Sequence, residues 1–231
     1  MTFDEFLSDI PLVAILRGLT PDRAIDVGET LVTAGFRCLE VPLNSPNPFD
    51  SIRLLAEHFG HQAIVGAGTV TDATAVGRLA MLGARIVVSP NCDVAVIRAT
   101  KASEMVSLPG VFTPTEAFAA IAAGADGLKL FPAEIAGPAG LRAMAAVIPS
   151  TAPIFAVGGV DGQTMQAWRA AGSRGFGFGS ALFQPGYSLG ELSRRATDIV
   201  RTWRELQGHE SGDRVSMQPA PDKGLVDTQF V

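Results

Sequence analysis

The chain has 231 residues, of which 47% are hydrophobic and 18% charged, and its formal net charge is −5 at pH 7. This composition supplies enough apolar residues for a large core, and the length suits one large domain or two small ones. The acidic balance argues against nucleic acid as a partner, because phosphate backbones select basic surfaces.

Membrane insertion and export are also disfavoured. No stretch reaches the roughly 18 uninterrupted apolar residues of a membrane span, and the first ten residues carry acidic side chains where a signal peptide has basic ones. The cysteines, Cys38 and Cys92, lack the spacing of a disulfide framework or a zinc site. We therefore expect a cytoplasmic protein that contacts no membrane.

Short apolar runs alternate with amphipathic patterns along most of the chain, which predicts strands alternating with helices. The predicted strands are Leu12–Arg17, Cys38–Leu43, Ala63–Gly68, Ile86–Ser89, Met105–Leu108, Gly127–Phe131, Ile154–Val157 and Gly175–Gly179. The predicted helices are Pro21–Ala34, Pro48–Phe59, Asp72–Leu82, Ala95–Lys101, Pro114–Ala123, Pro138–Ile148, Gly162–Ala171 and Leu189–Leu206.

Eight strands alternating with helices favour an α/β fold of the TIM type, a closed (β/α)8 barrel. An open doubly wound sheet is the alternative, but no Gly-x-Gly-x-x-Gly fingerprint follows the first strand. We predict one barrel domain over residues 1–207, with a short N-terminal helix. Residues 208–231 lose the periodicity and are rich in helix breakers, which predicts an extended tail.

Lys129, one of only three lysines, lies inside the apolar run Gly127–Phe131. A lysine in a buried strand has a lowered pKa and is then a nucleophilic amine that can form a Schiff base. Alternation along the strands places Lys129 and Glu40 on the inner face and Arg17 at a C-terminal strand end, where barrel enzymes assemble their sites. These are the only charged residues in the predicted strands. A structural ion cluster is the alternative reading.

Glycine pairs follow the last two predicted strands, at Gly158-Gly159 and around Gly179-Ser180. Backbone amides at such turns bind phosphate, and these two loops often do so in barrels. Glycine also suits any tight turn, so each pair alone is a weak signal.

Six segments together resemble the KDPG/KHG aldolase family: Ala14-Ile-Leu-Arg-Gly18, Leu39-Glu-Val-Pro-Leu-Asn-Ser-Pro46, Gly66-Ala-Gly-Thr69, Ser89-Pro-Asn91, Leu128-Lys-Leu-Phe-Pro132 and Val157-Gly-Gly-Val160. The resemblance spans about residues 10–206. It implies a class I aldolase that cleaves phosphorylated keto-deoxy sugar acids to pyruvate and glyceraldehyde 3-phosphate, and commonly a homotrimer.

The resemblance also implies site residues. Lys129 matches the imine lysine and Glu40 the proton shuttle. Substrate contacts are implied for Arg17 and Thr69 (carboxylate), for Pro90 and Phe131 (apolar wall), and for Gly158, Gly159, Gly179 and Ser180 (phosphate). Val157 stands where the members acting on the gluconate epimer usually carry threonine, so the chain is most similar to the members acting on the galactonate epimer.

Alternative functions remain open. Within the family they are cleavage of the gluconate epimer or of 4-hydroxy-2-oxoglutarate. Outside it they are a sugar-phosphate isomerase or synthase that uses Lys129 as a base, and a non-catalytic phospho-sugar sensor. We expect no cofactor and no metal, because an iminium supplies the needed electrophile and the three histidines show no ligand spacing.

Overall fold

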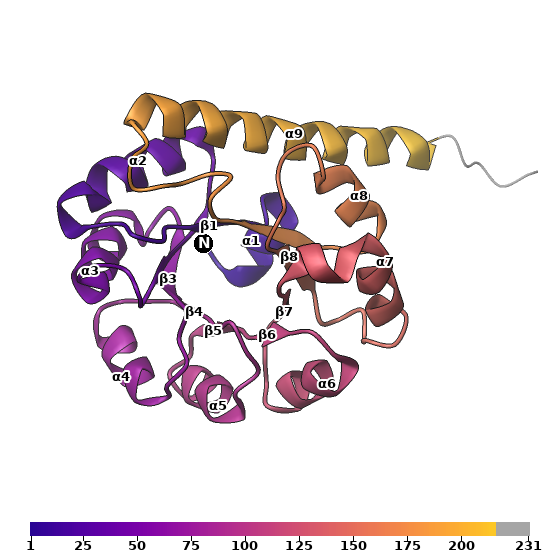
Figure 1. Cartoon of the computed structure of the whole chain (residues 1–231), viewed down its shortest axis with the longest axis horizontal. Coiled ribbons are helices and arrows are strands. Elements are labelled where there is room, and N and C mark those ends of the chain that lie inside the picture. Colours follow the sequence, from indigo (N-terminus) through magenta and orange to yellow (C-terminus); the bar gives the residue numbers. More distant parts are fainter. Residues whose placement is uncertain (216–231) are drawn as a thin grey trace, which may run out of the picture.

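The structure is a computed structural model that describes the backbone of residues 1–215 and the side chains of residues 1–208. Within these residues, nine parallel strands form a nearly closed barrel surrounded by helices (Figure 1). The strands are β1 (Leu12–Ile15), β2 (Cys38–Pro42), β3 (Ile64–Gly68), β4 (Ile86–Val88), β5 (Val106–Leu108), β6 (Gly110–Val111), β7 (Leu128–Leu130), β8 (Ile154–Val157) and β9 (Gly175–Phe178).

The predicted (β/α)8 class is confirmed, with one strand more than expected. β1 pairs with both β2 and β9, and the two ends of the sheet are β5 and β6. Pro109 divides these two strands, because it has no backbone N–H to donate to a neighbouring strand. β5 therefore pairs with β4, and β6 pairs with β7. β6 was not predicted, because a strand of only two residues leaves no sequence pattern.

The helices in the described part of the chain are α1 (Phe3–Asp9), α2 (Ala24–Ala34, after a 3₁₀ turn at Pro21–Arg23), α3 (Pro48–Phe59), α4 (Thr74–Met81), α5 (Val94–Ala102), α6 (Pro114–Ala122), α7 (Ala133–Ala145), α8 (Met165–Ala170) and α9 (Leu189–Val215). Helix α1 precedes β1, α9 follows β9, and the others connect strands. Helix α6 begins with a capping box between Thr113 and Glu116. None of the helices in the described part of the chain is long and apolar enough to cross a membrane.

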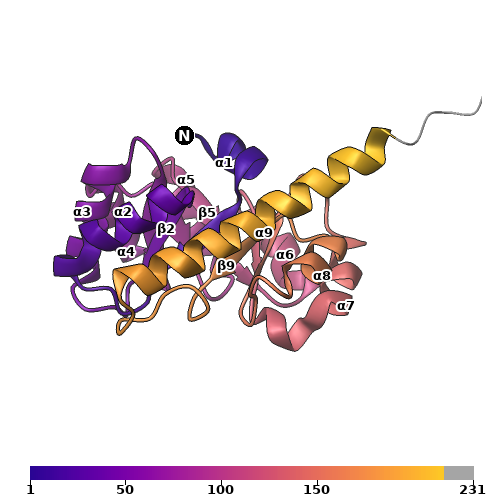
Figure 2. The same cartoon turned by 90° about the horizontal axis from the view of Figure 1, so that it is seen from above.

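Two helix bounds differ from the prediction by five residues or more, and the others differ by at most three. Helix α7 begins at Ala133 rather than Pro138, with a break at Gly137, whose φ is +66°. Helix α9 continues to Val215, so residues 208–215 are helical where the sequence predicted an extended tail (Figure 2). Extending an existing helix needs no new nucleation, and no proline intervenes before Pro219. The rest of the predicted tail, residues 216–231, lies outside the described residues.

The side chains form two apolar layers. Alternate strand residues point outward and pack under the helices, among them Leu39, Val41, Leu128 and Leu130. The other face fills the barrel with a smaller cluster that includes Val13, Ile15, Cys38, Leu108, Phe155 and Val157. Helix α1 packs its Phe6 ring on Phe155, at 6.2 Å between centroids, at the N-terminal end of the strands. The C-terminal strand ends therefore form the other mouth of the barrel.

Candidate active site

Lys129 lies in the middle of β7, with its side chain only 7% exposed. Its neighbours Leu128 and Leu130 are buried under the helices, so the alternation turns Lys129 into the barrel, as predicted. Its Nζ is 4.7 Å from the centroid of the Phe131 ring. Burial lowers the pKa of Lys129; Glu40 opposes this shift, and Arg17 adds to it.

Glu40 lies on β2 and is 1% exposed. Its carboxylate occupies space that only glycine leaves at position 68, because a Cβ there would come within 1.9 Å of Oε2. Oε2 is buried and has no hydrogen-bond partner among the described residues. Burial raises the pKa of Glu40 to about 7, although the charges of Lys129 and Arg17 favour its ionised form.

Arg17 follows β1 and connects the ends of three strands. Its Nη1 donates to Asn44 Oδ1 at 2.7 Å after β2, and its Nη2 donates to Thr69 Oγ1 at 3.4 Å after β3. Thr69 has a φ of +55°, which is uncommon for a β-branched residue. Such backbone strain is concentrated at functional sites. Asn44, which was not among the predicted site residues, is part of this cluster.

A cavity of about 590 Å³ lies at this mouth of the barrel. It is lined by every predicted site residue except Glu40: Arg17, Thr69, Pro90, Lys129, Phe131, Val157, Gly158, Gly159, Gly179 and Ser180. A smaller cavity inside the barrel is lined by both Glu40 and Lys129. It shares four lining residues with the larger cavity, namely Ile15, Lys129, Val157 and Gly177. The structure thus brings all the predicted residues to one site, with Glu40 on its inner side.

Four polar residues of the large cavity were not predicted, namely Asp161, Gln184, Tyr187 and Arg195. They lie in the loops after β8 and β9 and on α9. Nothing in the sequence marks them, because residues with such side chains are common in surface loops and on exposed helices.

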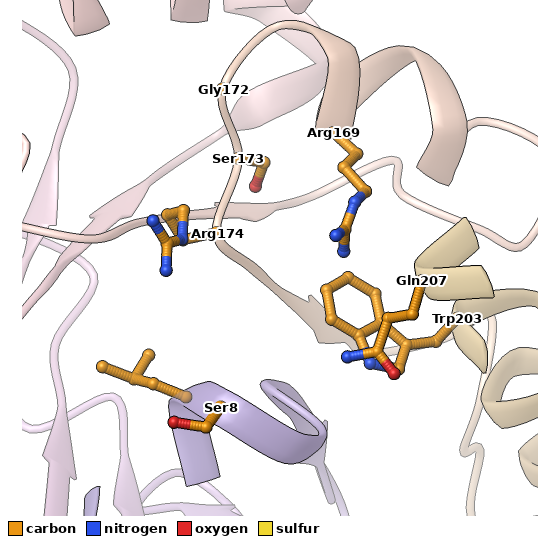
Figure 3. Close-up of a pocket in the computed structure, with 8 residues that line it drawn as sticks. Ser8, Arg169, Gly172, Ser173, Arg174, Trp203 and Gln207 are labelled. Atoms are coloured by element: carbon orange, nitrogen blue, oxygen red, sulfur yellow. The ribbon is translucent and has the colours of Figure 1, made fainter. Parts of the chain in front are cut away.

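A second cavity, of about 450 Å³, lies elsewhere, between α1, the residues around Ser173 and α9 (Figure 3). Figure 3 shows Arg169 and Trp203 side by side at its wall, and the guanidinium carbon is 4.4 Å from the ring centroid. The indole Nε1 of Trp203 donates to the backbone oxygen of Asp9 at 3.1 Å. Among the described residues, this cavity shares none of its lining with the cavity that holds Lys129.

Comparison with known proteins agrees with this geometry. The profile of the family "KDPG and KHG aldolase" matches residues 3–191. A Rhizobium meliloti (strain 1021) protein named "Probable 2-dehydro-3-deoxy-6-phosphogalactonate aldolase" is 48% identical over 86% of this chain and 93% of its own length. The Escherichia coli (strain K12) "2-dehydro-3-deoxy-6-phosphogalactonate aldolase" is 41% identical over 87% and 98%.

Among solved structures, one titled "Native KDPGal structure" superposes with a TM-score of 0.85 and 41% identity, covering 86% of this chain and 97% of that one. The family match, the relatives and the barrel with its inward lysine and glutamate lead to one conclusion: the chain belongs to the KDPG and KHG aldolase family.

Proposed function

We propose that this chain is a class I aldolase that cleaves 2-dehydro-3-deoxy-6-phosphogalactonate to pyruvate and glyceraldehyde 3-phosphate. The observation that carries the proposal is the pairing of two buried titratable groups inside one barrel. The pKa of Lys129 is lowered and that of Glu40 is raised to about 7. An amine whose pKa is lowered, in the same barrel as a carboxyl whose pKa is about 7, is the set that Schiff-base chemistry requires.

Lys129 acts as the nucleophile. Its neutral Nζ adds to the C2 ketone of the substrate, water leaves, and an iminium forms. The electron pair of the C3–C4 bond then moves toward the iminium nitrogen, which leaves an enamine on Lys129 and releases the aldehyde. Hydrolysis of the imine finally frees pyruvate and restores the amine.

Glu40 transfers the protons. It accepts the proton of the C4 hydroxyl while the C3–C4 bond breaks, and it delivers a proton to C3 of the enamine. A group with a pKa of about 7 is suited to both steps, because both of its protonation states are populated near neutral pH. No metal or cofactor takes part in this scheme, since the iminium is the electron sink.

The other residues bind and orient the substrate. Arg17 and Thr69 hold the pyruvyl carboxylate, and their mutual hydrogen bond supports a shared role. Pro90 and Phe131 form the apolar wall around the enamine. The backbone amides of the loops at Gly158-Gly159 and Gly179-Ser180 hold the phosphate.

Val157 supports the galactonate epimer as substrate, as do the names of the two relatives. The valine side chain lines both cavities, at the end of β8. It offers no hydroxyl to the substrate's C4 hydroxyl, whereas a threonine at this position could select the gluconate epimer.

A cytoplasmic homotrimer is also part of the proposal. Both cysteines are free thiols, which suits a reducing compartment. Large apolar side chains are exposed on and beside the consecutive helices α6 and α7: Phe112 is 41%, Phe118 47% and Ile135 71% exposed. Large apolar side chains exposed on consecutive helices favour an interface between subunits. Light scattering on the purified protein would measure the mass in solution.

Borohydride trapping tests the proposed reaction. Pyruvate plus borohydride should inactivate the protein and leave one reduced pyruvyl adduct on Lys129, and Lys129→Met should abolish the adduct. Lys101→Met is the matched control, because Lys101 pairs with Asp126 at 2.7 Å and does not line the cavity. An adduct elsewhere, or none at all, would reject the imine and favour an isomerase or synthase in which Lys129 is only a base.

A further inference from the structure

Within the described part of the chain, three cationic side chains line the large cavity: Arg17, Lys129 and Arg195. Arg17 follows β1, and Lys129 lies within β7. In the proposed function, Arg17 binds the carboxylate of the substrate and Lys129 attacks its ketone. Arg195 comes from α9, and the proposed mechanism gives it no role. Its side chain is half-buried, with 32% exposed.

The guanidinium of Arg195 is held on three sides. Its Nε donates to Glu191 Oε1 at 2.6 Å, and its Nη1 donates to the backbone oxygen of Ala181 at 3.1 Å. Its guanidinium carbon lies 4.6 Å from the centroid of the Tyr187 ring. No hydrogen bond of its Nη2 is found within residues 1–208. Nη2 of this oriented guanidinium is therefore available to a ligand, and Arg195 lines the cavity.

The loop that carries Tyr187 is itself fixed. Arg23, which precedes α2, donates from Nη2 to the backbone oxygen of Tyr187 at 2.8 Å and from Nη1 to that of Pro185. The backbone that carries the Tyr187 ring is therefore held by a second arginine. An arginine stacked on a ring and paired with a carboxylate loses little conformational freedom when it binds an anion.

Arg195 lies near one of the loops that are proposed to hold the phosphate. Its bond to Ala181 places it beside the loop Gly179-Ser180, one of the two loops proposed to hold the phosphate. Asp161 lines the same cavity, but its Oδ1 already accepts bonds from the backbone N–H groups of Gln163 and Thr164. A phosphate dianion in this position needs a cation, and arginine binds phosphate oxygens through paired N–H donors.

We propose that Arg195 binds the substrate's phosphate group, and that Glu191 and Tyr187 position its guanidinium for this contact. The inference rests on the proposed function and extends it, because it assigns the cation of the phosphate site to α9 rather than to the barrel strands. The competing explanation is a purely structural clamp that joins α9 to the loop after β9.

The test compares Arg195→Gln with Arg194→Gln. Arg194 is the neighbouring residue on α9 and also pairs with Glu191, at 2.8 Å, but its side chain is 61% exposed and does not line the large cavity. For each protein, kcat/KM is measured on the phosphorylated substrate and on 2-dehydro-3-deoxygalactonate, which lacks the phosphate. Competitive inhibition by inorganic phosphate gives an independent reading of the same contact.

Arg195→Gln should lower the ratio of the two kcat/KM values by about 10- to 100-fold, the scale of one hydrogen bond to a charged group. It should weaken inhibition by inorganic phosphate to a similar degree, whereas Arg194→Gln should change both by less than about twofold. Arg195→Lys keeps the charge without the paired donors and should give a smaller fall in the ratio. Glu191→Gln should lower the ratio less than Arg195→Gln does, because it loosens Arg195 without removing it.

The outcomes separate the two proposals. If the wild-type protein cleaves both substrates equally well, the phosphate site itself is wrong. If the wild type prefers the phosphorylated substrate but Arg195→Gln keeps that preference, only the role of Arg195 is wrong. Equal losses of kcat/KM on both substrates in Arg195→Gln, which leave their ratio unchanged, would identify a structural clamp. If Arg195→Gln does not fold, the same ratio is measured for Arg195→Lys. A ratio equal to that of the wild type in this variant overturns the proposal.

Discussion

Replacing Glu40 with glutamine should stabilise the protein, and the gain should grow with pH. The pKa of Glu40 is about 7 in the folded chain, against 4.5 for the free group, because burial disfavours its charged form. A carboxyl whose folded pKa is raised contributes stability that is fully present below the unfolded pKa and is lost as pH rises through the folded pKa. The window of this loss is therefore about pH 4.5 to 7.

The size of the effect follows from the two pKa values. Each pKa unit corresponds to about 1.4 kcal/mol, so the ionised carboxylate destabilises the fold by about 3 kcal/mol once the pH exceeds 7. Glutamine is shaped like the protonated acid and cannot ionise. The free energy of unfolding of Glu40→Gln should exceed that of wild type by about 1 kcal/mol near pH 5 and by about 3 kcal/mol near pH 8.

Thermal unfolding across this pH range is the assay. For a chain of this size, about 1 kcal/mol shifts Tm by about 2–4 °C, so the variant should melt roughly 6–12 °C above wild type near pH 8. Glu29→Gln is the matched control, because Glu29 is exposed on α2 and its carboxylate stays in water in both states. A Tm difference for Glu40→Gln that stays constant with pH, or that shrinks as pH rises, would refute the reasoning.

Two further predictions concern turnover. Glu40→Gln should still form the imine that borohydride traps. Its turnover and its rate of pyruvate C3 proton exchange should fall by about 10²-fold or more, the usual scale for a general acid–base group. Proton exchange at the wild-type rate would show that Glu40 has only a structural role. Val157→Thr should raise the gluconate-to-galactonate ratio of kcat/KM by roughly 2- to 12-fold, since a new hydroxyl that finds a partner contributes about 0.5–1.5 kcal/mol. An unchanged ratio would move epimer selection to another part of the site, such as the loop around Asn44.

The sequence predicts the barrel and the inner face of its strands well, because both follow from local patterns. The inward placement of Lys129 follows from the alternation between Leu128 and Leu130 alone. The helix ends at Gly35, Gly83, Gly124 and Gly172 were also predictable, and all four glycines have the positive φ that a left-handed cap needs.

The direction of the Glu40 pKa shift could not be predicted, because burial and nearby positive charge act in opposite directions. The structure shows that burial prevails. The deciding feature is on the neighbouring strand, where Gly68 leaves room for the carboxylate to lie inside the wall of the barrel. The sequence contains Gly68 but gives no sign of which side chain it makes room for.

Arg195 was missed for a different reason. Its pairing with Glu191 four residues earlier is the pattern of an ordinary solvent-exposed helix. Only the path of α9, which returns past the loop after β9, makes this residue part of a cavity. Contacts between segments that are distant in sequence have no signature in a local pattern.

Burial shifts the pKa values of Lys129 and Glu40 in opposite directions. It lowers the pKa of Lys129 and raises that of Glu40, so both move toward neutral pH, while their mutual attraction moves them apart again. A closer ion pair would keep Lys129 charged and therefore unreactive as a nucleophile. The apolar side chains inside the barrel, such as Ile15, Leu108 and Phe155, thus contribute to reactivity as well as to stability, because they exclude the water that would return both groups to their ordinary pKa values.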